Sequence, residues 1–449
     1  MTVSDTVARS PFGVRDFRLL WLGEAISALG DQFALIALPW LALVLTGSAL
    51  ALGTVLALMA VPRALLMLVG GVWVDRLSPR RVMLGSNAVR LVAVTLLGIA
   101  ILGGTEQLWM LYAFALVFGL ADAFFFPAQT SIVPELVEPD QLQAANGITQ
   151  GTTQATVLVG PAVAGLIIAA LGADGVQASA TGIAIALLLD GASFVASLVT
   201  LLLIRSRPEH HATATSVVEA IREGIRFLWG SAGLRAVVLI SLTGNLLIVG
   251  PFEVGFPVLA YTRLPEGAAA FGLVMSAFGG GSLLGYVAGA VLPNPRPSLF
   301  APAVMGSLAI AGLGVAALSA VSSTLVAAAL CAASGIALGY GNLLGLSWAQ
   351  ARIPPNLMGR VMSLLLLGSV GLVPISELVA GAAVQVSLAG MLIVAGAGMA
   401  IFSLGTLLWP TIRNLGFEPP YRTEADDTPS SGAGPAGAMA TASPTILAD

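Results

Sequence analysis

The sequence predicts an all-α membrane protein with twelve transmembrane helices in two six-helix halves. Of its 449 residues, 57% are hydrophobic and only 9% are charged, whereas soluble domains are about 25% charged. Apolar runs of about 20 residues, the length that crosses a bilayer as a helix, recur along the chain. The 52 glycines and 6% aromatic residues are typical of closely packed membrane helices.

The predicted spans follow one another with short polar connections, except for one long interruption after the sixth. In order they are Leu19–Leu45, Ala49–Val74, Val82–Leu102, Leu108–Thr130, Ala144–Leu171, Thr181–Ile204, Ala236–Ala260, Phe271–Leu292, Phe300–Ala320, Leu325–Ser347, Val361–Val386 and Ala389–Trp409.

The arginines predict the orientation, because cytoplasmic loops of membrane proteins are enriched in basic residues. With the N-terminus inside, 16 of the 19 basic residues, all of them arginine, lie in cytoplasmic segments. Arg263 falls in an outer loop, and Arg63 and Arg90 fall within spans. We therefore expect a multi-pass protein of a bacterial-type inner membrane with both termini in the cytoplasm.

The long interruption divides the chain. We expect a cytoplasmic N-terminus over 1–18, a first half over 19–204, a cytoplasmic linker over 205–235, a second half over 236–412 and a disordered cytoplasmic tail over 413–449. Within the linker, Val217–Trp229 carries apolar residues at helical spacing between charged ones. This pattern predicts an amphipathic helix on the inner membrane face.

Composition also excludes several classes of protein. A net charge of −4 argues against a nucleic-acid partner, and one cysteine with two adjacent histidines argues against a disulfide framework or a metal site. A chain without lysine has no Gly-x-x-x-x-Gly-Lys-Ser/Thr phosphate loop, so an ATP-driven pump is disfavoured. We find no nucleophile–base or metal constellation that indicates an enzyme, and we expect no cofactor.

Two motifs carry a resemblance to a known family. The run Gly71-Val-Trp-Val-Asp75-Arg76-Leu-Ser-Pro-Arg80-Arg81 follows the second span, and Gly160-Pro161-Ala-Val-Ala-Gly165 lies in the fifth. The first resembles the loop signature of the major facilitator superfamily, with one extra residue before its arginine pair. The second is similar to that family's antiporter signature, with alanine in place of one glycine. The resemblance implies the major facilitator fold.

Further stretches resemble the macrolide-efflux and enterobactin-exporter branch of these drug–proton antiporters. They are Ile26-Ser-Ala-Leu-Gly-Asp31, Gly119-Leu-Ala-Asp122-Ala-Phe-Phe-Phe-Pro-Ala128, Asp190-Gly-Ala-Ser-Phe194 and Pro354-Pro-Asn-Leu-Met-Gly-Arg-Val361. The resemblance implies a monomeric secondary exporter that exchanges lipophilic drugs or antibiotics for protons by alternating access. One departure is Ala115, which stands where many drug–proton antiporters carry an arginine four residues before a glycine.

The resemblance also implies which residues gate the conformational change. Asp75 corresponds to the acid that caps the eleventh helix, and Arg80 or Arg81 to the arginine that pairs with an acid on helix four, here Asp122. The full set of gating candidates is Gly71, Asp75, Arg76, Arg80, Arg81, Asp122, Gly160, Pro161 and Gly165.

Charged residues inside spans are costly and therefore suggest function. Asp31 and Arg63 lie about 20 Å and about 18 Å from the inner face at 1.5 Å per residue, so we expect them to pair as a proton-sensitive switch. A static ion pair that holds the two helices together is the alternative. Glu24, seven residues before Asp31, faces the same side, and Asp190 also lies near mid-membrane. Asp122 and Arg90 are expected in the inner half, paired with each other or with the loop.

The candidates for substrate contact in a mostly apolar central cavity are Gln32, Asn245 and Asn342. Glu253 and Glu377 lie near the outer ends of spans, where we expect ordinary solvated acids. The expected partners are a lipophilic small molecule, protons and the lipid bilayer. A siderophore or metabolite exporter of the same fold, or a non-transporting membrane sensor, remains an alternative.

Overall fold

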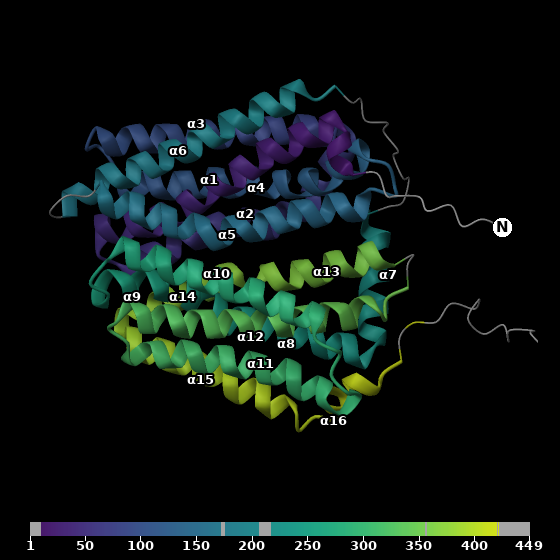
Figure 1. Ribbon diagram of the computed structural model, residues 1–449. Coiled ribbons are helices and arrows are strands. Elements are labelled where there is room, and N and C mark those ends of the chain that lie inside the picture. The colour runs from purple at the N-terminus through teal and green to yellow at the C-terminus, as the bar shows by residue number, and fades with distance from the viewer. Residues whose placement is uncertain (1–9, 172–175, 206–216, 355–356, 420, 422–449) are drawn as a thin grey trace, which may run out of the picture.

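The computed structural model describes residues 10–171, 176–205, 217–354, 357–419 and 421. In this part of the chain, eleven helices are long and apolar enough to cross a membrane, and one shorter apolar helix, Val373–Val386, accompanies them. Figure 1 shows two layers of roughly parallel and antiparallel helices, one from each half of the chain. The predicted all-α, two-half membrane fold is confirmed.

The helices of the first half have simple bounds. They are α1 (Arg15–Thr46), α2 (Ala49–Leu77), α3 (Pro79–Leu102), α4 (Leu108–Leu136), α5 (Leu142–Ala170) and α6 (Val176–Leu203). The amphipathic segment of the linker forms α7 (Val217–Gly230), which runs across one end of the bundle in Figure 1.

The second half contains more helices than spans. They are α8 (Ala232–Glu253), α9 (Gly255–Arg263), α10 (Ala268–Val291), α11 (Pro297–Ala317), α12 (Thr324–Gln350), α13 (Met358–Gly371), α14 (Val373–Val386), α15 (Leu388–Thr406) and α16 (Pro410–Arg413). Short 3-10 turns cover Pro11–Gly13, Leu318–Ala320 and Leu415–Phe417.

Two predicted spans are each built from two helices. The seventh is α8 followed by α9, and the eleventh is α13 followed by α14. Pro251 lies near the end of α8 and Pro374 in the first turn of α14. Because proline donates no backbone hydrogen bond, the helical ladder is interrupted at these points.

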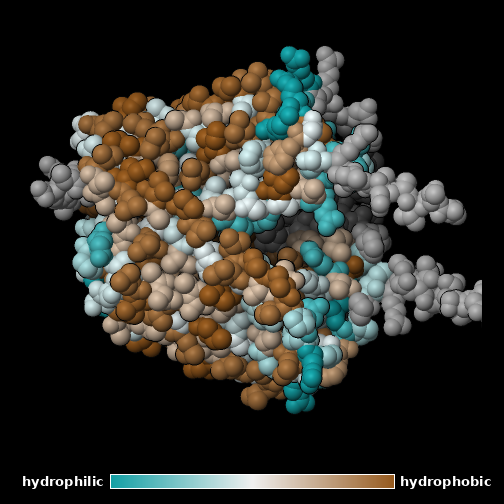
Figure 2. All heavy atoms as spheres, in the orientation of Figure 1, coloured by the Kyte–Doolittle hydropathy of each residue, from teal (hydrophilic) through white to brown (hydrophobic). Residues whose placement is uncertain are grey.

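The halves meet at one end of the bundle, which we call the turn end because it contains the Gly47–Ser48 turn between α1 and α2. The opposite end, where α7 lies, is the linker end. At the turn end Gln385 donates to the Ser48 hydroxyl at 2.7 Å, and the Trp40 and Tyr261 rings are 5.5 Å apart. Figure 2 shows a hollow between the halves at the linker end.

The segment that directly follows α15 packs against the second half of the bundle. Residues 413–419, at the start of the predicted disordered tail, are docked on the second half: Trp348 donates from its indole nitrogen to the Leu415 carbonyl at 2.8 Å. The Arg352 guanidinium stacks 4.4 Å from the Trp348 ring and donates to the Glu418 carbonyl. Residues 422–449 of the predicted tail lie outside the described residues.

Candidate functional site: a buried acid cluster in the first half

Small residues on α1 let it approach α6 closely. A Cβ atom at Gly23 would lie 2.0 Å from the Thr200 hydroxyl, and one at Gly30 would lie 2.1 Å from the Ser193 hydroxyl and 2.7 Å from Asp190 Oδ1. Asp31 directly follows Gly30. The glycines therefore place the Asp190 carboxyl group against the segment of α1 that carries Asp31.

The only arginine of this buried region with a described ion pair is Arg90, on α3. It is 2% exposed, and its guanidinium binds the Asp122 carboxylate of α4. Three aromatic rings surround the guanidinium, with centroids 4.1 Å (Phe125), 5.4 Å (Phe118) and 5.7 Å (Phe194) away. Stacked aromatic faces stabilise a cation that has lost its water.

Glu24 is held by hydrogen bonds from two other helices. Gln129 of α4 donates to Glu24 Oε2 at 2.6 Å, and Ser197 of α6 donates to Oε1 at 3.2 Å. The Asn87 side chain of α3 donates to Ser197 at 2.9 Å. A polar chain thus runs from α3 through α6 to α1 and α4.

Asp31 and Asp190 are less completely satisfied. Asp190 is fully buried; Ser193 donates to its Oδ1 at 3.4 Å, while its Oδ2 has no hydrogen-bond partner. Asp31 Oδ1 is likewise buried without a partner. Asp31 lies within the electrostatic reach of Arg90 and Asp122, and Asp190 within that of Asp31.

We call Glu24, Asp31, Asp122, Asp190 and Arg90 the acid cluster. Its four carboxyl groups share one guanidinium, so full ionisation would bury a net charge of −3. Burying unpaired charge is expensive, and binding a proton removes that cost. The geometry is therefore suited to taking up and releasing protons. In the described residues no group of three or more His, Cys, Asp or Glu side chains is arranged to hold a metal ion.

The expected Asp31–Arg63 pair does not form. Arg63 instead lies 6.0 Å from the centroid of the Phe126 ring, and its Nε has no hydrogen-bond partner. The reason is helix adjacency, because α1 packs chiefly against α6 and α5, whereas α2 packs chiefly against α4 and α14. Equal depth in the membrane did not make the two residues neighbours.

Of the two partners expected for Asp122, the structure confirms Arg90, whose guanidinium binds it. The pairing with Arg80 or Arg81 of the loop is wrong. Arg80 instead donates to the carbonyls of Leu201 (2.7 Å) and Leu202 (2.9 Å) at the C-terminus of α6. Arg81 is exposed. Gly71, Asp75 and Arg76 lie on α2, but their side chains are outside the described part of the chain.

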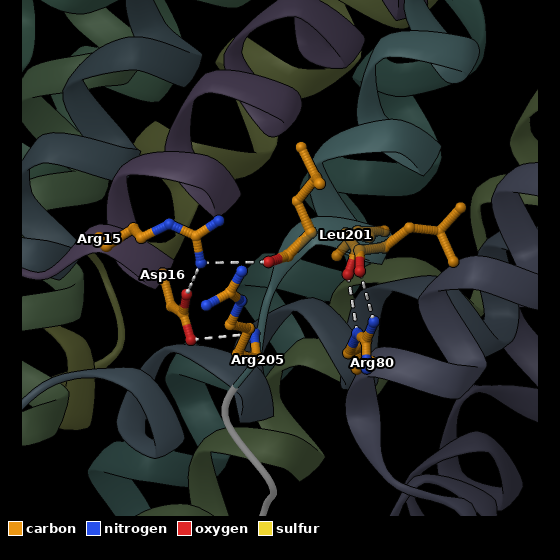
Figure 3. A network of polar contacts seen from close by, with 7 residues as sticks. Arg15, Asp16, Arg80, Leu201 and Arg205 are labelled. Carbon is orange, nitrogen blue, oxygen red and sulfur yellow. Dashed lines mark hydrogen bonds and ion pairs between the residues drawn. The ribbon is translucent and has the colours of Figure 1, made fainter.

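Figure 3 shows how the end of α6 is held. Beside Arg80, Arg15 donates to the Leu203 carbonyl at 3.3 Å, and Asp16 accepts from the Arg205 amide at 3.1 Å. Basic side chains at a helix C-terminus satisfy its unpaired carbonyls and complement its dipole. The first residues of α1 and α3 thus fasten α6 at the linker end.

Replacing Arg80 with glutamine should loosen this end of α6. A charge–dipole contact of this kind contributes about 0.3–1 kcal/mol, which corresponds to about two- to fivefold faster amide hydrogen exchange in the last turn of α6. Arg81→Gln is the matched control, because it removes the same charge from an exposed neighbour. Equal exchange rates in the two variants would contradict the role of Arg80.

The Gly160–Gly165 motif lies on α5 at the contact between the halves. A Cβ at Gly165 would lie 2.5 Å from the Ala268 carbonyl and 3.0 Å from Gly272 Cα, both on α10. The Ala162 amide, next to Pro161, donates to the Ser276 hydroxyl of α10 at 2.8 Å. Gly160 accommodates the Gln32 side chain of α1, which a Cβ would meet at 2.5 Å. The motif therefore packs α5 against α1 of its own half and against α10 of the second half.

The three cavity candidates lie on three different helices, α1, α8 and α12. Gln32 packs on Gly160, and its Oε1 is buried without a hydrogen-bond partner. Asn245 donates to the Ser241 carbonyl of its own helix at 3.0 Å, and Asn342 is exposed on α12. Sequence reasoning missed Gln129, Asn87 and Ser197 of the Glu24 network, since polar residues of this size carry no distinctive spacing.

Together, a bundle of membrane-length helices in two halves and a buried cluster of titratable groups define the class of multi-span membrane transporters. A family model described as Major Facilitator Superfamily matches residues 20–375. The chain belongs to this superfamily.

Curated relatives and solved structures are similar over most of the chain. The multidrug efflux pump Tap of Mycobacterium tuberculosis is 27% identical over 377 residues, which cover 81% of this chain and 85% of that protein. Macrolide efflux protein A of Streptococcus pyogenes is 24% identical over 78% of this chain and 84% of that protein.

Two solved structures share the fold. A bacterial homologue of the iron transporter ferroportin, in its inward-facing state, has a TM-score of 0.68 at 18% identity, over 87% of this chain and 98% of that one. The nucleoside transporter NupG has a TM-score of 0.67 at 12% identity, over 88% of this chain and 98% of that one.

Proposed function

We propose that the protein exports lipophilic small molecules, of the drug and antibiotic class, from the cytoplasm across the bacterial inner membrane in exchange for protons. The observation that carries the proposal is the acid cluster, in which the partnerless Asp31 and Asp190 oxygens lie buried beside a single arginine. Protons bound there would neutralise charge that the protein otherwise buries at a cost. The multidrug and macrolide efflux relatives support the substrate class.

In this proposal the linker end faces the cytoplasm. Arg15, Arg80 and Arg205 lie there, as the enrichment of basic residues in cytoplasmic segments requires, and Figure 2 shows hydrophilic residues gathered at that end. The closed turn end and the hollow at the linker end then correspond to an inward-open state. Rocking of the two halves about their contact would alternately expose the bundle's interior to the two faces of the membrane.

The test uses everted membrane vesicles with an acidic lumen and a pH-quenched dye. Erythromycin, tetracycline, ethidium and a catechol siderophore are added in turn, and export into the lumen should release protons and restore the dye's fluorescence. We expect a response to at least one of the three drugs and a loss of at least tenfold in the Asp31→Asn variant, because an amide cannot carry the exchanged proton.

Asp140→Asn is the control, since Asp140 is exposed in the connection between α4 and α5, and it should respond as the wild type does. A response to the siderophore alone would favour a siderophore exporter. No response to any compound from a correctly inserted protein would contradict proton-coupled drug export.

A further inference from the structure

A second pair of acids lies in the other half of the bundle. Glu253 is the last residue of α8, and Glu377 lies in the second turn of α14. Glu377 is 2% exposed, so the expectation of a solvated acid is wrong for this residue. Its Oε2 has no partner among the described residues, and the carboxyl group of Glu253 lies within its hydrogen-bonding and electrostatic reach.

Close backbone packing fixes α14 against α8 beside these acids. Ser376 accepts a hydrogen bond from the Gly250 amide at 2.8 Å and donates one to the Leu246 carbonyl at 2.7 Å. The hydroxyl group is thus inserted in the hydrogen-bond ladder of α8, one residue before Pro251. A Cβ at Gly250 would meet the Ser376 carbonyl at 2.1 Å, so the two helices cannot separate or approach without changing the position of Glu377.

The other side of Glu377 faces the first half. A Cβ at Gly53 of α2 would lie 2.5 Å from the Glu377 carbonyl and 3.2 Å from Gly381 Cα. On the same helix, Arg63 acts electrostatically on Glu377. Among the side chains that the structure describes, Glu253 from α8 and Arg63 from α2 are the charged groups whose fields reach Glu377.

Two ionised carboxylates in contact and away from water repel each other strongly, whereas one proton held between them gives a hydrogen bond and a single negative charge. Arg63 then balances that charge. Because α2 and α14 belong to different halves, this arrangement exists only while the halves touch at the turn end. Once they part, water reaches the carboxyl groups, and both can ionise.

We propose that Glu253 and Glu377 form a proton-binding site that holds one proton between the two carboxyl groups while the turn end is closed, and that opening of this end releases it to water. The step converts a carboxylic acid and a carboxylate into two carboxylates and one free proton. The proposal rests on the alternating opening of the halves described above, but not on the acid cluster. Since the closed state binds one more proton, raising the pH favours the open state.

The test follows the distance between spin labels at Leu50→Cys on α2 and Val386→Cys on α14, both exposed at the turn end, in a Cys331→Ser background. The protein is reconstituted in lipid nanodiscs without substrate, and distances are measured from acidic to alkaline pH. For one linked proton, the ratio of long to short distances should rise by up to tenfold per pH unit. Glu377→Gln and Glu253→Gln should each remain at the short distance at every pH, because either amide imitates the singly protonated pair.

Glu266→Gln is the matched control. It removes an acid that is exposed at the same end and hydrogen-bonded to Thr324, and it should keep the wild-type response. A wild type without pH-dependent distances, or a pH dependence that survives in both Glu253→Gln and Glu377→Gln, would overturn the proposal. The vesicle assay is independent of this outcome: if Asp31→Asn abolishes drug–proton exchange while both glutamine variants keep the pH response, the proposed function stands and this second site does not.

Discussion

Valine at Gly165 should lower transport about 10- to 100-fold by holding the halves apart at the turn end. The new Cβ would lie 2.5 Å from the Ala268 carbonyl and 3.0 Å from Gly272 Cα, which are backbone atoms that cannot rotate away. Overpacking of this kind costs about 1–3 kcal/mol, and each 1.4 kcal/mol changes an equilibrium about tenfold. Because only the closed state contains the clash, the open state gains population.

Gly151→Val is the control on the same helix, since no atom lies within 4 Å of a Cβ at Gly151. The Leu50–Val386 label distance should lengthen in Gly165→Val and stay at its wild-type value in Gly151→Val. Gly272→Val should behave as Gly165→Val does, because its Cβ would meet the Pro161 carbonyl at 2.2 Å. Wild-type transport by both Gly165→Val and Gly272→Val would show that this contact does not limit closing.

The second large effect is expected from Arg90→Gln, which should reduce the thermal stability of the detergent-solubilised protein and abolish transport. The substitution leaves the Asp122 carboxylate buried without its cation and the aromatic rings of Phe118, Phe125 and Phe194 around an uncharged group. Removing one partner of a buried ion pair costs about 3–5 kcal/mol. The unfolding temperature measured by calorimetry should fall by several degrees.

A double-mutant cycle separates the ion pair from packing. Asp122→Asn in the Arg90→Gln background should recover much of the lost stability, because the uncompensated charge is gone. Transport should not recover in the double variant, because Arg90 no longer holds the acids of the cluster in the protonation state that exchange requires. Additive losses of stability in the double variant would show that Arg90 and Asp122 do not act as a pair.

The fold could be predicted from the sequence because its determinants are local. Apolar runs of membrane length and the polar interruption over 205–235 define the helices and their division into halves. Breaks within spans depend on single prolines such as Pro251 and Pro374, which the hydropathy pattern does not resolve.

The candidate site was only partly predictable. Counting residues gives the depth of a charge in the membrane but not which helices are neighbours, so Asp31 and Arg63 were paired at equal depth although α1 lies against α6. Gly30, directly before Asp31, is the local signal from which the close contact of α1 with α6 could have been predicted. The burial of Glu377 was not predicted because it depends on the close contact of Gly53 on α2 with Gly381 on α14. These helices belong to different halves, and the sequence around Glu377 does not indicate that they touch.

If the acid cluster carries the exchanged proton, substrate binding should release protons from it. The purified protein is mixed, in weakly buffered detergent solution, with the drug that gives the largest vesicle response, and the released protons are counted with a pH indicator. We predict a measurable release from the wild type and from Asp140→Asn, and a release that is lost when both Asp31→Asn and Asp190→Asn are present. Undiminished release from that double variant, at unchanged drug binding, would show that Asp31 and Asp190 do not carry the exchanged proton.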